Sequence, residues 1–270
     1  MSDPGSPGRV AIVTGAGSGI GQATTVAFCR AGYDVAAGDV DRSGLEETVR
    51  LAEGLPGSVD AVSADVTDSF TVESLTGAAL RLGQLQAAVN CAGIVGPTLD
   101  LSESDSSRLR DVSDPDWARV IEVNLTGVFN CVRSQMRAMW DTGGAIVNLS
   151  SIAGVVGTAG LGPYVASKHG VVGLGKTAAL EGAPRGIRVN TICPGTVATP
   201  MLMEAFGSDP TQTAARDAAT PLGRPGEPEE LAEVAVWLCG DSASYITGVS
   251  LPVDGGTTSM NPRSGVAGKT

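Results

Sequence analysis

Charge and histidine are scarce in this sequence. Charged residues make up 17% of the chain, where about a quarter is usual, and His169 is the single histidine among 270 residues. A metal site would therefore depend on carboxylates and thiols, and no ligand spacing of that kind is present. We expect no metal. A chain with so little charge is expected to have a large apolar core and to form subunit interfaces.

Long apolar runs and paired cysteines are missing too. No run approaches the roughly 18 apolar residues that a membrane-spanning helix needs, and residues 1–8 lack the apolar stretch of a signal peptide. The five cysteines are scattered without a C-x-x-C pair, which is typical of reduced thiols in a cytoplasmic protein. The net charge of −11 disfavours nucleic acid and anionic membranes as partners.

Apolar segments alternate along the chain with segments of helical character. Short apolar runs predict buried strands at 10–14, 35–38, 59–64, 85–90, 145–149, 188–192 and 249–253. Helices are predicted at 19–31, 43–53, 69–82, 115–139, 164–182 and 228–239. This alternation predicts a doubly wound α/β fold, in which helices cover both faces of a parallel sheet.

One domain is expected over residues 1–270, because no linker or change of composition divides the chain. Residues 1–8 and 259–270 are expected to be flexible tails. The polar, acidic stretch 97–114 interrupts the alternation. It is a solvated loop or, as an alternative, the rim of an active-site mouth.

Glycine and polar residues follow the predicted strands at their carboxyl ends, where open parallel sheets bind ligands. "TGAGSGIG", residues 14–21, follows the first strand, but Ile20 stands where the G-x-G-x-x-G fingerprint needs its last glycine. The backbone of this loop could still approach a pyrophosphate beside a helix N-terminus, and an ordinary tight turn is the alternative. Later strands end in "NCAG" at 90–93, in two serines at 150–151 and in "PG" at 194–195.

Acidic residues end the second and third strands. Asp39 would accept hydrogen bonds from ribose hydroxyls and repel a 2′-phosphate, so the sequence predicts NAD rather than NADP. Asp65, followed by Val66, could bind the adenine amino group. The alternative for Asp65 is a helix N-cap together with Asp68.

Tyr164 and Lys168 lie four residues apart in "GPYVASKHG", on one face of a predicted helix. Such a pair is usually a surface contact, but here Ser151 and the expected cofactor lie at the same edge of the sheet. A phenol acts as a base near neutral pH only when its pKa falls by about three units, which a nearby ammonium favours. The arrangement suits hydride transfer between a carbinol carbon and a nicotinamide, with Ser151 orienting the substrate oxygen.

Together these motifs resemble the short-chain dehydrogenase/reductases over roughly residues 8–258. They are "TGAGSGIG", "NCAG", "VNLTG", "YVASK" thirteen positions after Ser151, and "PGTVATP". The resemblance implies a seven-stranded Rossmann-type fold with Tyr164 as acid/base. Lys168 would lower the phenol pKa and bind the ribose, and Asn124 would hold a proton-relaying water or kink its helix. Cys91 stands where the family often has a second asparagine.

The strand ends and the resemblance together give the expected residues of the site. The catalytic set is Asn124, Ser151, Tyr164 and Lys168. The cofactor-binding set is Gly15, Ser18, Gly19, Ile20, Asp39, Asp65, Val66, Asn90, Ala92, Gly93, Tyr164, Lys168, Pro194, Gly195, Val197 and Thr199.

The substrate is expected to be a secondary alcohol or ketone. "MLMEAF", residues 201–206, forms an apolar lid or packs in the core, and a lid would favour a bulky or apolar substrate. One alternative is a 3-oxoacyl-(acyl-carrier-protein) reductase, with Arg133 and Arg137 facing an acidic partner. Another is an NAD-sensing protein without catalysis. The resemblance also implies a homo-oligomer, dimer or tetramer, in which helices 115–139 and 164–182 pair between subunits.

Overall fold

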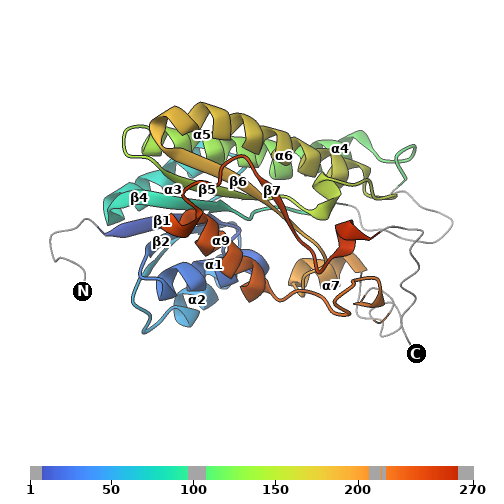
Figure 1. The fold of residues 1–270 in the computed structure, drawn as a ribbon, viewed down its shortest axis with the longest axis horizontal. Coiled ribbons are helices and arrows are strands. Elements are labelled where there is room, and N and C mark those ends of the chain that lie inside the picture. Colours follow the sequence, from blue (N-terminus) through green and yellow to red (C-terminus); the bar gives the residue numbers. More distant parts are fainter. Residues whose placement is uncertain (1–7, 97–107, 207–213, 215–216, 261–270) are drawn as a thin grey trace.

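A seven-stranded parallel sheet forms the centre of the molecule, with the strand order β3-β2-β1-β4-β5-β6-β7. The computed structural model describes residues 8–96, 108–206, 214 and 217–260. Helices cover both faces of the sheet (Figure 1). The predicted doubly wound fold is therefore confirmed. Residues 1–7, 97–107 and 261–270, which contain most of the expected tails and insertion, lie outside the described residues.

All seven predicted strands are present, with ends within two residues of the prediction. They are β1 (Arg9–Thr14), β2 (Asp34–Asp39), β3 (Val59–Ser63), β4 (Gln84–Asn90), β5 (Gly144–Leu149), β6 (Ile187–Pro194) and β7 (Ser250–Val253). The central strands are apolar throughout because both of their faces are buried, as in β1, where Val10 to Val13 are at most 1% exposed.

Five of the six predicted helices match closely, and the sixth, 115–139, contains a π-helical turn. The helices are α1 (Gly19–Arg30), α2 (Arg42–Leu51), α3 (Ser69–Leu82), α4 (Asp114–Ile121), α5 (Gly127–Met139), α6 (Gly162–Gly182), α7 (Pro200–Phe206) and α9 (Pro228–Cys239). Single turns lie at Ile152–Gly154, Ala183–Arg185, Asp241–Ala243 and Thr257–Ser259. None of the described helices combines the length and apolar character needed to cross a membrane.

The predicted helix 115–139 is not continuous. A π-helical turn, Glu122–Thr126, separates α4 from α5. The periodicity of the sequence cannot reveal this turn, because its cause is tertiary: the side chain of Asn124 is held by the backbone of Ile94. Helix α7 was not predicted either, since a seven-residue helix carries too few turns to show a period.

Two apolar cores fill the space between the sheet and its helices. Alternate residues of β1 point to opposite faces, so Ala11 and Val13 belong to one core and Val10 and Ile12 to the other. Figure 1 shows α1, α2 and α9 on the first face and α5 and α6 on the second. This arrangement leaves the carboxyl ends of the strands to the loops, where α4 and α7 also gather.

Three buried amides connect the central strands to α5. Asn90 donates to Gln135 (3.0 Å) and to Asn148 (2.9 Å), and Gln135 donates back to the Asn90 side-chain oxygen (2.7 Å). All three residues are at most 1% exposed. Buried amides stabilise a fold only while their partners are in place, so this network holds α5 at a fixed position on β4.

Replacing Gln135 by methionine should therefore destabilise the fold. The change keeps the side-chain volume but leaves the Asn90 oxygen and one of its N–H groups without a partner. We expect a loss of about 2–4 kcal/mol in the free energy of unfolding, measured by denaturant titration. A loss below about 0.5 kcal/mol would show that the network contributes little.

Candidate active site

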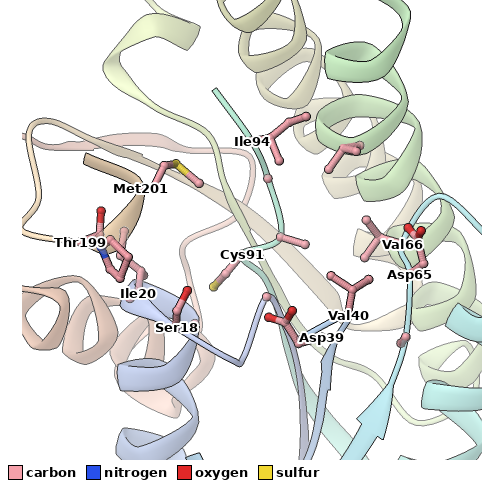
Figure 2. A pocket seen from close by; sticks show the side chains of 18 of the residues that line it. Ser18, Ile20, Asp39, Val40, Asp65, Val66, Cys91, Ile94, Thr199 and Met201 are labelled. Carbon is pink, nitrogen blue, oxygen red and sulfur yellow. The ribbon is translucent and has the colours of Figure 1, made fainter. Parts of the chain in front are cut away.

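Two adjoining cavities lie at the carboxyl edge of the sheet, where the strand order reverses between β1 and β4. The first has a volume of about 280 Å³ and the second about 360 Å³. They share Ile20, Cys91, Gly93, Thr199 and Met201 in their linings. Figure 2 shows the first cavity, with β2, β3 and β4 ending around it. A reversal point of this kind is where doubly wound folds bind their ligands.

The glycine loop brings the start of α1 close to the end of β4. Gly15 has φ +67°, and a Cβ on it would lie 2.7 Å from the backbone nitrogen of Ala92. A Cβ on Gly21 would collide with the backbone oxygen of Gly15. Ser18 stands at the N-cap of α1 without a side-chain capping hydrogen bond, and it lines the first cavity. The first-turn N–H groups therefore suit a pyrophosphate, as the sequence predicts.

Asp39 lines the first cavity at the end of β2, beside the exposed Val40 (Figure 2). Its two carboxylate oxygens accept hydrogen bonds from the backbone N–H groups of Gly17 (2.8 Å) and Asp41 (2.9 Å). These bonds fix the carboxylate beside the glycine loop. A carboxylate has about four acceptor sites, so it can still accept bonds from ligand hydroxyls.

Asp65 lines the same cavity together with Val66, at the end of β3. Its carboxylate accepts hydrogen bonds from the backbone N–H (2.9 Å) and the hydroxyl (2.8 Å) of Thr67. The N-cap of α3 is Asp68, which accepts from Phe70 at 2.9 Å. Asp65 therefore does not cap the helix, and the structure places it facing the cavity.

Tyr164, Ser151 and Lys168 meet in the second cavity. Ser151 follows β5 and Tyr164 lies in the first turn of α6, and the Ser151 hydroxyl is close enough to the phenol to lower its pKa. The ammonium of Lys168 donates to the backbone oxygen of Leu149 at 3.0 Å and lies 5.5 Å from the centre of the Tyr164 ring. The neighbouring Ser150 instead donates to the backbone oxygen of Lys168 (2.9 Å). The structure thus assigns the hydroxyl near the phenol to Ser151.

Burial has the largest effect on the pKa values of Tyr164 and Lys168. It raises the pKa of the Tyr164 phenol, and the nearby Ser151 hydroxyl opposes part of that rise. Burial also lowers the pKa of Lys168 to about 8, although Cys91 and Cys193 oppose that shift. In the chain alone the lowering expected from Lys168 does not offset burial, because Lys168, with a pKa of about 8, loses its charge before a phenol of raised pKa titrates.

Asn124 connects three segments around the site. Its side-chain oxygen accepts from the Ile94 N–H (2.8 Å), and its amide donates to the Ile94 carbonyl (2.7 Å) and to the Ser167 hydroxyl (3.2 Å). Ser167 donates in turn to the Tyr164 carbonyl at 2.7 Å. The side chain thus positions the loop after β4 against α6. The helix irregularity anticipated at Asn124 is present as the π-helical turn.

Most predicted site residues line one of the two cavities. In the first are Gly15, Ser18, Gly19, Ile20, Asp39, Asp65, Val66, Ala92, Gly93 and Thr199. In the second are Ser151, Tyr164, Lys168, Pro194, Gly195 and Val197. Asn90 and Asn124 are in neither lining, and the Asn90 side chain points instead into the amide network with Gln135. The described residues contain no group of three His, Cys, Asp or Glu side chains arranged to bind a metal.

Several lining residues were not predicted. Arg119 lines the first cavity from α4, and Ile94 reaches it from the loop after β4. Ile152 and Leu161 line the second cavity from the segment between β5 and α6. The sequence carries no local signal for these residues, because each is an ordinary side chain that only the path of the chain brings to the site.

The apolar segment 201–206 stands partly at the site. Met201 lines both cavities and Leu202 lines the second, whereas Met203 is 48% exposed. The side chain of Phe206 lies outside the described part of the structure. The position of α7 over the edge of the sheet fits a lid better than a core element, because Met201 and Met203 are both more than a third exposed.

Comparisons with known proteins show that the sequence is similar to reductases and dehydrogenases. A family model described as "Enoyl-(Acyl carrier protein) reductase" matches residues 15–258. A 3-oxoacyl-(acyl-carrier-protein) reductase FabG of Thermotoga maritima is 41% identical over 251 residues, covering 92% of this chain and 97% of the relative. A 3beta-hydroxysteroid dehydrogenase 1 of Eggerthella lenta is 42% identical, covering 93% of this chain and 94% of the relative.

Solved structures also include reductases that are similar to this chain. A crystal structure of actinorhodin polyketide ketoreductase with NADPH superposes with a TM-score of 0.85 at 34% identity, covering 94% of this chain and 98% of that one. The chain therefore belongs to the short-chain dehydrogenase/reductase family. Members of this family use a nicotinamide cofactor, and the two cavities fit one.

Burial of Lys168 leads to a prediction on stability. Unfolded, this lysine keeps its proton to about pH 10.5, whereas folded it loses the proton near pH 8. The unfolded state thus binds more protons between these values, so the free energy of unfolding rises with pH there. Below pH 8 the buried charge costs about 3 kcal/mol, and the bond to Leu149 recovers roughly 1 kcal/mol.

We therefore expect Lys168→Met to stabilise the cofactor-free protein by roughly 2 kcal/mol at pH 7, with a smaller difference at pH 9.5. Denaturant unfolding of both proteins at equal concentration measures the difference. Lys176→Met, at an exposed position of the same helix, controls for the loss of a lysine charge. A difference that widens as the pH rises would contradict the assigned pKa.

Proposed function

We propose that this protein is an NAD(H)-dependent oxidoreductase that interconverts an apolar secondary alcohol and its ketone. The observation that carries the proposal is the meeting of Ser151, Tyr164 and Lys168 in a cavity continuous with one that suits a dinucleotide. Bound in the two cavities, the nicotinamide cofactor would supply or accept the hydride. The chain itself provides the proton transfer and the orientation of the substrate.

Tyr164 exchanges the proton of the substrate hydroxyl through its phenol oxygen. Ser151 and this phenol line the same cavity, and the Ser151 hydroxyl is close enough to lower the phenol pKa, so a substrate oxygen that enters between them is held by both hydroxyl groups. Lys168 keeps a positive charge beside the ring while its ammonium is anchored to the Leu149 carbonyl. Burial keeps the phenol protonated until further positive charge enters the site, which suits a proton donor for ketone reduction.

NAD is preferred over NADP in this proposal because of Asp39. Its carboxylate is fixed by the N–H groups of Gly17 and Asp41 at the edge of the first cavity, so it cannot swing away from a 2′-phosphate without losing both bonds. The next residue, Val40, offers no positive charge. A carboxylate held in this way attracts ribose hydroxyls and repels a phosphate.

The substrate class follows from the second cavity. Its lining is mainly apolar, with Ile152, Leu161 and Leu202 around the hydroxyl groups of Ser151 and Tyr164. Among the described lining residues, Lys168 is the one charged side chain. A neutral, apolar ring system with a secondary hydroxyl or keto group fits this lining, and the similarity to a hydroxysteroid dehydrogenase supports that choice.

A ketoreductase acting on acyl-carrier-protein substrates is the second candidate, because a relative with that name is 41% identical. The charge of −11 disfavours an acidic carrier protein as a partner. Arg133 and Arg137, the expected contacts, line a separate groove between α5 and α6 rather than either cavity of the site. The dehydrogenase of apolar alcohols is therefore the better supported proposal.

The same α5–α6 face supports the proposed homo-oligomer, and the five free cysteines support a location in the cytoplasm. The groove on it has a volume of about 580 Å³ and is lined by Phe129, Met136, Trp140 and Leu174. Phe129 is 43% and Trp140 38% exposed, which is unusual for large apolar side chains unless a partner covers them.

Removing the phenol hydroxyl tests the catalytic proposal. Tyr164→Phe should lower kcat by a factor of about 10²–10⁴, because proton transfer is lost while the ring remains. NADH affinity, followed by cofactor fluorescence, should stay within about threefold, since Tyr164 is one of many contacts. Tyr245→Phe, at a fully exposed position, is the matched control.

Turnover is measured with a panel of cyclic and linear secondary alcohols and NAD⁺. If the wild-type chain binds the cofactor but turns over none of these alcohols or their ketones, a sensing role replaces the enzymatic one. If Tyr164→Phe keeps the wild-type kcat, the phenol is not the acid/base.

Neutralising Asp39 tests the cofactor proposal. We expect the wild-type chain to bind NADH more tightly than NADPH, and Asp39→Asn to reduce this preference roughly 10- to 100-fold by removing the repulsion. Asp41→Asn removes an equal charge two residues away, where the side chain caps α2, and asparagine caps as well as aspartate. Equal effects of the two variants, or tighter NADPH binding by the wild type, would contradict the role of Asp39.

A further inference from the structure

Arg119 is the positive side chain of the first cavity. It lies on α4, one helical turn before Val123, and both residues line the cavity because residues four apart share a helix face. Among the described lining residues of this cavity, Arg119 is the one cation, whereas Asp39 and Asp65 are acidic. An anionic dinucleotide entering here thus meets one mobile positive charge.

The guanidinium of Arg119 is held only weakly where it is. It lies 3.9 Å from the carboxylate of Glu122, and the two side chains are 58% and 56% exposed. An exposed pair of this kind contributes about 0–1 kcal/mol, and salt screens it. Arg119 can therefore turn from Glu122 toward the cavity at little cost, and its exposure means that replacing it leaves the core unchanged.

The surroundings of Arg119 suit an aromatic base. Val40, Val66 and Val123 give the cavity apolar walls near the ends of β2 and β3, and Asp65 adds a hydrogen-bond acceptor (Figure 2). Apolar walls with one acceptor suit adenine, which has flat faces and an exocyclic amino group. A guanidinium is planar and stacks on such faces while keeping its charge.

We propose that Arg119 is an affinity residue for the adenine half of the cofactor, a step that rests on the proposed dinucleotide site. Its guanidinium folds over the base and covers the open side of the first cavity. The expected contribution is about 3- to 30-fold in Kd, the range typical of a cation on an aromatic face. Because the base is common to NAD and NADP, both cofactors gain equally.

Calorimetric titration of the full chain with NADH, NADPH and ADP-ribose tests this proposal without measuring activity. Arg119→Met should weaken the binding of all three ligands by the same factor of about 3–30. Arg30→Met is a matched control, because Arg30 is also an exposed arginine, 3.7 Å from a glutamate, Glu233, and lies outside the first cavity. This variant should bind like the wild type.

Four results would overturn the proposal. Unchanged ADP-ribose binding by Arg119→Met would show that the guanidinium does not contact the adenosine half. A loss confined to NADPH would show that Arg119 faces a 2′-phosphate instead of the base. Equal losses in Arg119→Met and Arg30→Met would show a general effect of charge. A wild-type chain that binds none of the ligands would refute the proposed function itself and this proposal with it.

Discussion

The reversal of strand order between β1 and β4 is the constraint on which the site depends. The chain builds β2 and β3 on one side of β1 and then returns to place β4 on the other. The loops after β1 and β4 consequently diverge and leave a cavity between them. Gly15 shows how closely the two loops still approach, since a Cβ there would lie 2.7 Å from the backbone nitrogen of Ala92. The glycine loop therefore serves the packing of the fold as well as ligand binding.

The second constraint is the burial of charge beside the phenol. Lys168 is 4% exposed and has a backbone carbonyl, that of Leu149, as its hydrogen-bond partner. Burial disfavours both the ammonium and the phenolate, so the chain alone holds a neutral phenol beside a cation whose pKa is about 8. This is a site built for a further charge, because a cation entering it would favour the phenolate in a medium where little water screens the attraction.

The sequence predicts the sheet and the meeting of Ser151, Tyr164 and Lys168 in one cavity, because both leave local signals. Apolar runs mark the strands, and the spacing of Tyr164 and Lys168 places them on one face of α6. Prediction from the sequence fails where contacts between distant segments determine the local structure. An irregular helix at Asn124 was anticipated, but not the bond of its side chain to Ile94, thirty residues away. The Asn90 side chain turns to Gln135 although its strand ends at the site. No motif states how deeply a side chain is buried, and in the chain without cofactor burial raises the Tyr164 pKa.

The acidic net charge of the chain does not prevent an anionic dinucleotide from binding, because most of its charges act from too far away. Surface charges beyond about 8–10 Å are largely screened at physiological salt, so the net charge of −11 acts weakly on a ligand inside the cavity. Nearby, the carboxylates of Asp39 and Asp65 are partly neutralised by N–H donors. The N–H groups in the first turn of α1 and the guanidinium of Arg119 then determine the electrostatic potential inside the cavity. The same net charge still repels a long polyanion, whose many phosphates extend beyond any such pocket.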